Sequence, residues 1–453
     1  MITVKGKHRK KRTVSSRFWS FDNLYLVVMT IYMAQMTSAT RVNTFNMIDF
    51  IAPGIPLFLT AIQAFRFKVK FSDRQFWLVM SVLLTWFVCY LFKMLLYGGQ
   101  TQHWNVMYIF FIITYSYVMC RVYGRSLFYL FERIMVVLSL IAFACYLFQL
   151  VLPDVADRIF TMFPLAGHGG NNVLYLYHYV SANNEEYFLE LYGHLLRNSG
   201  FAWEPGRYSI MLVPAILFNM YRKQGHILKN NRNFYILNIA LISTFSTTGL
   251  CTAFIMYAMY MINKLSVKSV LIAVFVLIPA GFILYTQSFV VDKFDSQMEI
   301  SGDMDTYREM VFQGDDAEEH HAIDRLPSLM FECMNISEDP LLGYGHWFNS
   351  YFYKNVTEVV RTTGGVLHVF GYYGLLLGGF LYWCLWRSSA KIAQSFKSKK
   401  KALFMIVVVL SSVSYPVFDV ILFNTFWMYG MFVKNEQMNM PIKKIKLKKI
   451  YAK

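Results

Sequence analysis

Long apolar blocks recur along this 453-residue chain, and they constrain its fold more than any other feature. Each runs for roughly 17–25 residues, the length that a helix needs to cross the hydrocarbon core of a bilayer. Hydrophobic residues make up 56% of the sequence and charged residues only 15%. A soluble protein of this size would need more charge on its surface. The sequence therefore predicts an all-α polytopic membrane protein.

The basic residues indicate which ends of the blocks share one side of the membrane. Most of the 43 Lys and Arg residues fall in the two tails or in short connections, at 66–74, 121–133, 222–232, 264–268 and 387–401. Such clustering follows the positive-inside rule, so these connections and both termini are expected in the cytoplasm. The clustering also explains the net charge of +16 without nucleic acid as a partner.

About twelve transmembrane helices satisfy this charge pattern. Two longer blocks, 234–263 and 402–433, have basic residues at both ends, so each must cross an even number of times. The STTGL sequence at 246–250 and the SYP sequence at 414–416 are natural breaks within them, because glycine and proline interrupt helices. Single spans are expected at 21–38, 48–65, 76–96, 104–120, 131–152, 201–221, 269–287 and 366–386.

This topology divides the chain into five segments. Two long external loops are expected, at 153–200 and 288–365, and the second holds more than half of the 27 acidic residues. Loops of this length in a compact fold are usually functional. Transmembrane helices occupy the remaining segments: helices one to five in 1–152, the central helices in 201–287, and the C-terminal helices with a basic cytoplasmic tail in 366–453.

The stretch RNSGFAWEPGRYS at 197–209 leads into an apolar block that is expected to run from outside to inside. Pro205 suits the first turn of a helix, which places Glu204 near the cap and Arg207 in the first turn. A helix N-terminus carries partial positive charge, and the forked donors of Arg197 and Arg207 suit phosphate oxygens. The stretch therefore predicts a phosphate or diphosphate site at the outer interface. The alternative is a simple interfacial ion pair between Glu204 and Arg207, three residues apart.

The second external loop supplies further polar side chains near the same interface. Arg361 and His368 flank the start of the following span, and His346 lies beside Trp347. A histidine titrates near neutral pH and can act as a base or contact phosphate. Aromatic side chains such as Trp203 and Trp347 form interfacial belts by default, and they also suit stacking against sugars.

No metal or cofactor site is predicted. The run DDAEEHH at 315–321 places metal-ligand residue types consecutively rather than on one face, so a solvated acidic loop is the expected structure. The six cysteines show no disulfide or zinc spacing.

Three motifs together resemble one family of membrane enzymes. They are R-x-x-G-F-x-x-E-P-G at 197–206, the S-T-T-G-L break, and an arginine followed by E-D-P-L-L-G-Y-G at 325–345. Their order, spacing and sidedness resemble the O-antigen and exopolysaccharide polymerases (Wzy-type), which are relatives of the O-antigen ligases. The local resemblance covers roughly 197–260 and 325–379.

The resemblance implies a metal-independent glycosyltransferase with a GT-C-like fold in the bacterial inner membrane, with both long loops in the periplasm. Its substrate would be an oligosaccharide repeat unit linked to undecaprenyl diphosphate, with a flippase and a chain-length regulator as candidate partners. By this resemblance Arg197 and Arg325 match loop arginines of the family, and Glu204 matches the glutamate of its E-P motif. Arginines can stabilise the charge that grows on the diphosphate leaving group, and Glu204 or His368 would accept the proton of the attacking hydroxyl.

Two other functions stay open on the sequence. An O-antigen ligase would share most of these features, but the His-Asn dipeptide typical of ligases is absent, which favours a polymerase. A polysaccharide transporter or flippase would concentrate ionisable residues at mid-membrane. The expected spans carry few, among them Lys93, Glu132, Arg133 and Asp419.

Overall fold

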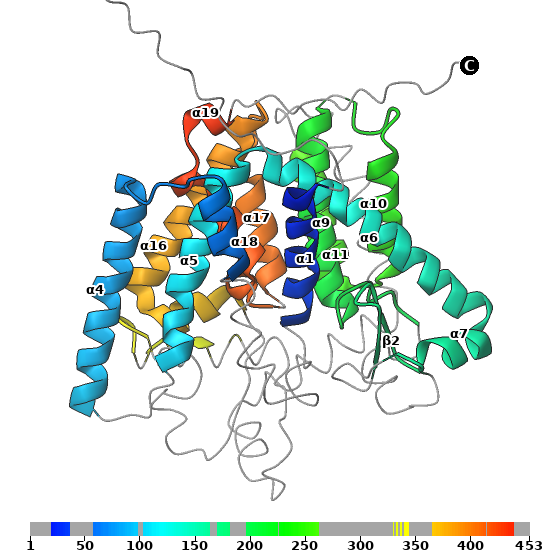
Figure 1. The fold of residues 1–453 in the computed structure, drawn as a ribbon, viewed down its shortest axis with the longest axis horizontal. Helices are drawn as coiled ribbons and strands as arrows, with labels where there is room; N and C mark the ends of the chain where they lie inside the picture. The colour runs from blue at the N-terminus through cyan, green and yellow to red at the C-terminus, as the bar shows by residue number, and fades with distance from the viewer. Residues whose placement is uncertain are drawn as a thin grey trace, which may run out of the picture.

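The computed structural model describes residues 20–36, 58–97, 103–163, 170–181, 196–261 apart from 225, and 365–438 apart from 414, with short pieces between 329 and 343. Within these residues the chain is mostly helical, and the helices lie side by side in a bundle (Figure 1). The longer helices are α1 (Phe21–Met36), α4 (Arg74–Tyr97), α5 (His103–Tyr123), α6 (Ser126–Val151), α9 (Pro205–Lys223), α10 (Arg232–Ser243), α11 (Thr247–Met261), α16 (Gly365–Ser395), α17 (Leu403–Ser412) and α18 (Ile421–Phe432). The short elements are α7 (Pro153–Phe160), the 3-10 helix η2 (Val417–Asp419) and α19 (Asn435–Met438).

Three of the described helices are long and apolar enough to cross a membrane. They are α4 over Arg74–Lys93, α6 and α16. Their length and composition agree with the predicted all-α membrane class. Six predicted single spans overlap helices α1, α4, α5, α6, α9 and α16, of which only α4, α6 and α16 have the length and composition of a span. The predicted span at 269–287 lies outside the described residues.

A small hairpin interrupts the otherwise helical chain within the first predicted loop. Strands β1 (Asn171–Val173) and β2 (Tyr177–Tyr179) pair antiparallel, with Asn172 opposite His178. Helix α7 packs beside them, and the Tyr179 hydroxyl donates to the Asp157 carboxylate at 2.8 Å. The hairpin and α7 mark one end of the bundle, here called the hairpin end, and α19 marks the opposite end, here called the α19 end (Figure 1).

The predicted cytoplasmic connections that the structure describes meet at the α19 end. The Lys391 ammonium, near the end of α16, lies 3.4 Å from the Asn435 amide oxygen of α19. Each described connection contacts the next one along the chain. The contacts are between Asp73 and Arg121, between Glu132 and Arg222, and between the Gln224 side chain and the Phe396 carbonyl. Basic connections that the sequence assigns to one side of a membrane therefore lie at one end of the bundle.

Both predicted double spans are broken near the expected positions. Helix α10 ends at Ser243 and α11 begins at Thr247, so the break lies at the start of the STTGL sequence. Helix α17 ends at Ser412, and η2 and α18 follow Pro416. Helices α10, α17 and α18 have 12, 10 and 12 residues, whereas crossing the hydrocarbon takes about 20.

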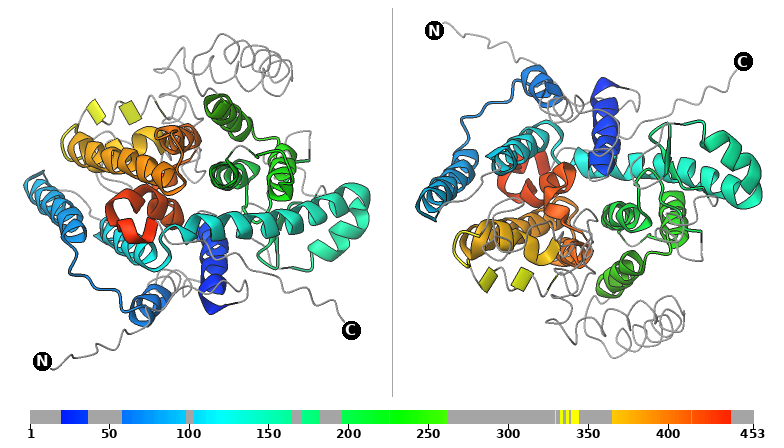
Figure 2. Two further views of the ribbon diagram at one scale, coloured as in Figure 1. Left: turned by 90° about the horizontal axis from the view of Figure 1, so that it is seen from above. Right: turned by 90° about the horizontal axis from the view of Figure 1, so that it is seen from below.

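Helix α18 lies between α5 and α16 and contacts both (Figure 2). Every one of its residues is buried, as expected for a helix that is apolar on all sides. Polar contacts also hold it: Ser116 of α5 donates to the Asn424 amide oxygen at 2.9 Å, and Ser388 of α16 donates to the Trp427 carbonyl. Small and polar residues of this kind join helices within membranes, where the hydrophobic effect does not.

Candidate functional site

The structure confirms the predicted start of α9 at the hairpin end. Pro205 is the first helical residue, and Glu204 is the N-cap with an extended backbone. The Glu204 side chain makes no capping hydrogen bond; its Oε2 instead lies 3.7 Å from Nε of Arg207. This distance exceeds that of a hydrogen bond, so the two groups form a loose ion pair. The ion pair expected as the simpler alternative is therefore present. Its presence does not decide whether Glu204 and Arg207 also have a functional role, which depends on the residues around them.

Two aromatic rings hold the Arg207 guanidinium. Its carbon lies 4.2 Å from the centroid of the Trp203 ring and 3.9 Å from that of the Tyr415 ring. Such cation–π contacts, together with the loose ion pair to Glu204, keep the guanidinium beside the break between α17 and α18. Tyr415 belongs to the break between α17 and α18, which the sequence identified only as a break. Sequence reasoning therefore missed Tyr415, since no local signal connects it to Arg207.

The Arg-Asn-Ser-Gly segment before α9 is fixed to the break between α10 and α11. Arg197 donates through Nε to the Thr244 carbonyl at 3.1 Å. Asn198 donates its backbone N–H to the Ser243 carbonyl and its amide to the Ser243 hydroxyl, both at 2.9 Å. The bond from Arg197 uses one of the five N–H donors of its guanidinium. The first motif is thus fixed to the residues that directly precede the STTGL sequence.

Helix α11 packs closely on the first turns of α9. The Ser209 hydroxyl donates to the Ser246 hydroxyl at 3.1 Å. A Cβ at Gly249 would lie only 2.4 Å from the Ser209 side chain, so the glycine is needed for this approach. The STTGL sequence therefore joins two helices as well as marking a break.

His368 lies one turn into α16 and is buried. Its Nδ1 is 3.6 Å from the Glu332 carboxylate, which is fully buried and comes from the second predicted loop. Its ring also contacts that of Tyr372. Glu332 was not among the predicted site residues, although a lone acid within the apolar stretch SLMFECM was a signal for it. A carboxylate beside an imidazole orients the ring and stabilises its protonated form.

One segment connects the surroundings of His368 to those of Glu204. A Cβ at Gly365 would lie 2.3 Å from the Tyr415 carbonyl oxygen, so the start of α16 presses against the break that carries Tyr415. The Tyr415 ring contacts Arg207, which pairs with Glu204. The two predicted catalytic residues therefore lie on either side of the same break, at the hairpin end.

The Asp-Pro-Leu-Leu-Gly turn of the third motif is locked between α4 and α16. Lys93 of α4 pairs with Asp339 and donates to the Gly343 carbonyl at 2.8 Å, and Trp86 donates to the Leu342 carbonyl at 2.9 Å. Lys93, considered above as a transporter-like residue, thus has a structural partner.

Helix α16 is interrupted where this turn meets it. Gly374 has φ of 71°, and Gly343 has φ of 68°. A Cβ on either residue would lie within 2.4 Å of the other segment's backbone. Both the dihedral angles and the close approach require glycine.

Gly343→Ala and Gly374→Ala should each lower the thermal unfolding midpoint of the purified protein. The left-handed conformation alone costs a residue with a Cβ about 1–2 kcal/mol, and backbone overlap adds to it. Gly379→Ala is the matched control, because a Cβ at Gly379 meets nothing within 4 Å. An unchanged midpoint in both test variants would contradict the locked turn.

Glu132, another ionisable residue of the predicted spans, lies away from this site, whereas Asp419 ends η2 four residues after Tyr415. The Glu132 carboxylate accepts from Nε of Arg222 at 2.7 Å and from the Asn219 and Asn233 amides at 2.7 and 2.9 Å. This cluster is at the α19 end; Arg222 closes α9, about 27 Å along the helix from Glu204 at 1.5 Å per residue. A structural role for Glu132 is favoured by its distance from the site and by the several donors that its carboxylate already accepts.

Four predicted site residues lie outside the described residues: Arg325, His346, Trp347 and Arg361. The DDAEEHH run also lies outside them. Among the residues that the structure does describe, no group of three or more His, Cys, Asp or Glu side chains could hold a metal ion. Neither a family model nor a curated protein sequence matches this chain.

Proposed function

We propose that the protein is a membrane glycosyltransferase that polymerises undecaprenyl-diphosphate-linked repeat units into O-antigen, capsule or exopolysaccharide. The observation that carries this proposal is the meeting of separated motif segments at the hairpin end. The Arg197–Gly206 segment contacts the break before α11, Arg207 stacks on Tyr415, and Tyr415 adjoins the turn of α16 that carries His368. These segments are far apart in the chain, and the first of them carries the polymerase-like motif at 197–206.

The described groups suit a transfer from a lipid diphosphate. The oxygen of a sugar hydroxyl on one repeat unit attacks the anomeric carbon of the other, and the bond from that carbon to the diphosphate oxygen breaks. The hydroxyl proton passes to Glu204 or His368, and the lipid diphosphate leaves with the bonding electrons. Arg197 and Arg207 stabilise the charge that develops on the diphosphate, so no metal is required. Arg325 and Arg361 would add to this positive charge.

The finer architecture belongs to the same proposal. About twelve spans in a GT-C-like arrangement place the hairpin end in the periplasm of a bacterial inner membrane and both termini in the cytoplasm. The gathering of the basic connections at the α19 end supports this orientation. Short broken helices at the hairpin end are tolerable within the bilayer, because protein groups such as Arg197 and Asn198 occupy the carbonyls at the α10–α11 break.

Reporter fusions test the orientation. Fusions at 175 and 330 should report the periplasm, and fusions at 227 and 394 should report the cytoplasm, because basic connections stay inside. A cytoplasmic signal at 175 or 330 would remove the external site and the polymerase proposal with it.

Deletion of the gene separates polymerase from ligase. Glycan profiling should show single repeat units on the cell surface lipid if the protein polymerises, because transfer of one unit continues without it. Accumulation of unattached polymer would instead assign the ligase function. The transporter alternative has less support, because Lys93 and Glu132 both sit in ion pairs within the described residues.

A further inference from the structure

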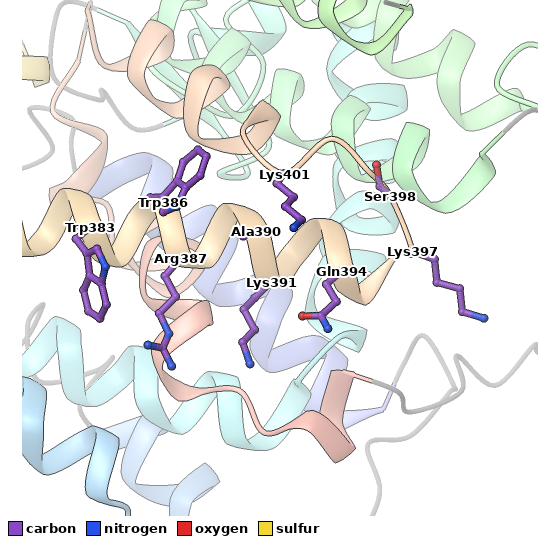
Figure 3. A pocket seen from close by; sticks show the side chains of 9 residues that line it. All are labelled: Trp383, Trp386, Arg387, Ala390, Lys391, Gln394, Lys397, Ser398 and Lys401. Carbon is purple, nitrogen blue, oxygen red and sulfur yellow. The ribbon is translucent and has the colours of Figure 1, made fainter. Parts of the chain in front are cut away.

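A basic cavity of about 730 Å³ lies beside the last turns of α16, far along that helix from His368 (Figure 3). It is lined by Trp383, Trp386, Arg387, Ala390, Lys391, Gln394, Lys397, Ser398 and Lys401. Four of these residues are basic and none is acidic. Within the described residues, no carboxylate forms a salt bridge with any of the four. The cavity therefore concentrates positive charge that no acidic side chain in the described part of the chain neutralises by a salt bridge.

The lining changes from aromatic to basic along α16. Trp383, Arg387 and Lys391 are four residues apart and so share one face of the helix, over about 12 Å of its length. The Arg387 guanidinium carbon lies 5.5 Å from the Trp383 ring centroid. Trp383 and Trp386 are 45% and 47% exposed, although they belong to one of the helices able to cross a membrane. Tryptophan is enriched where a membrane helix passes the headgroup level, and lysine and arginine follow it toward water.

The contacts that the structure describes for Arg387, Lys391, Lys397 and Lys401 use only part of the hydrogen-bond donors of these four cations. Nε of Arg387 reaches the Gly430 carbonyl at 3.3 Å, and the Lys391 ammonium reaches the Asn435 amide at 3.4 Å, both long hydrogen bonds that leave other donors on each group. Lys397 and Lys401 are exposed. An anion entering the cavity would therefore find several donors without breaking an ion pair.

We propose that this cavity binds the phosphate headgroup of an anionic phospholipid in the leaflet at the α19 end. The phosphate contacts Arg387, Lys391 and Lys401, and the acyl chains lie along the exposed tryptophan faces. Basic pockets between transmembrane helices bind anionic headgroups in this way. A free phosphate would satisfy the cations but leave both tryptophans without an apolar partner, so the lipid is the favoured source. The proposal depends on the bundle lying in a membrane and is independent of the polymerase function.

Native mass spectrometry of the detergent-purified protein tests this binding. Phosphatidylglycerol and phosphatidylcholine with identical acyl chains are the two probes. The wild-type protein should retain more phosphatidylglycerol, and Lys391→Gln/Lys397→Gln/Lys401→Gln should lose the preference. One cation near an anionic surface changes affinity by about fivefold, so losing three should weaken binding by at least about tenfold, allowing for incomplete additivity. Arg387 is left intact because it contacts α18.

A matched variant, Lys70→Gln/Lys229→Gln/Arg232→Gln, removes three exposed cations at the same end of the bundle, outside the cavity. This control variant should keep the wild-type preference for phosphatidylglycerol. An equal loss of preference in both variants would show that general surface charge causes it, and would contradict a specific site in the cavity. Unchanged binding in the cavity variant would also overturn it. If that variant unfolds at lower temperature, Lys391→Glu replaces it as a single charge reversal with the same expected loss. Millimolar inorganic phosphate should not displace the lipid; displacement would assign the cavity to a free anion instead.

Discussion

Arg207→Ala should lower the rate of chain extension by about 10²–10³ or more, the cost of removing one group that stabilises developing negative charge. The rings of Trp203 and Tyr415 both contact the Arg207 guanidinium, so its position is fixed before substrate binds. Arg207→Lys keeps the charge but loses the planar stack and the forked donors, so it should recover little activity. The measurement is extension of a lipid-linked repeat unit by purified protein.

A control at the other end of the bundle isolates the role of Arg207. Lys229→Gln removes an exposed cation at the α19 end and should leave the rate unchanged. A wild-type rate in Arg207→Ala, with normal amounts of inserted protein, would show that Arg207 only pairs with Glu204.

Glu204→Gln should lower the same rate by about 10²–10⁴ if Glu204 accepts the proton of the attacking hydroxyl. The glutamine keeps the size and hydrogen-bonding reach of the side chain, so the substitution isolates the charge. If Glu204 serves only its ion pair, the change should be nearly silent, because a partly exposed pair contributes about 0–1 kcal/mol. The Glu204 side chain is 31% exposed and lies 3.7 Å from Arg207, so little stability depends on it.

His368→Ala is the reciprocal test for the base. A wild-type rate in Glu204→Gln together with an inactive His368→Ala would move the base to His368. In that case Glu332 becomes a positioning residue, because its buried carboxylate faces the imidazole. Glu332→Gln should then lower kcat with little change in KM, because the imidazole loses the carboxylate that orients it. Loss in both Glu204→Gln and His368→Ala would indicate a shared proton path.

The helices could be predicted because an apolar run of about 20 residues can form few structures other than a membrane helix. The runs do not mark helix ends well, because a helix continues past the apolar region where its polar side chains find partners. Helix α16 runs to Ser395 rather than 386, and the added turns carry Arg387 and Lys391 beside the cavity. Helix α6 begins at Ser126 rather than 131, so its first turn belongs to the basic connection at 121–133.

The composition of the site could be predicted only in part. Glu204, Pro205 and Arg207 lie within one helical turn, so local rules were sufficient to place them. The contact between Arg207 and Tyr415 joins residues far apart in the chain, as does the pair of Glu332 and His368. One sequence gives the periodicity of each segment but not which segments touch. The hairpin was missed because its two strands have only three residues each.

The central claim is that this protein joins lipid-linked repeat units. The most direct measurement is incubation of the purified wild-type protein with undecaprenyl-diphosphate-linked repeat units in the presence of a chelator, with Glu204→Gln and Arg207→Ala in parallel, followed by separation of products by length. The account predicts a ladder of longer lipid-linked glycans from the wild-type protein, retained under chelation and absent from both variants. A wild-type protein that inserts normally yet leaves the single repeat units unchanged, or an Arg207→Ala variant that yields the full ladder, would contradict it.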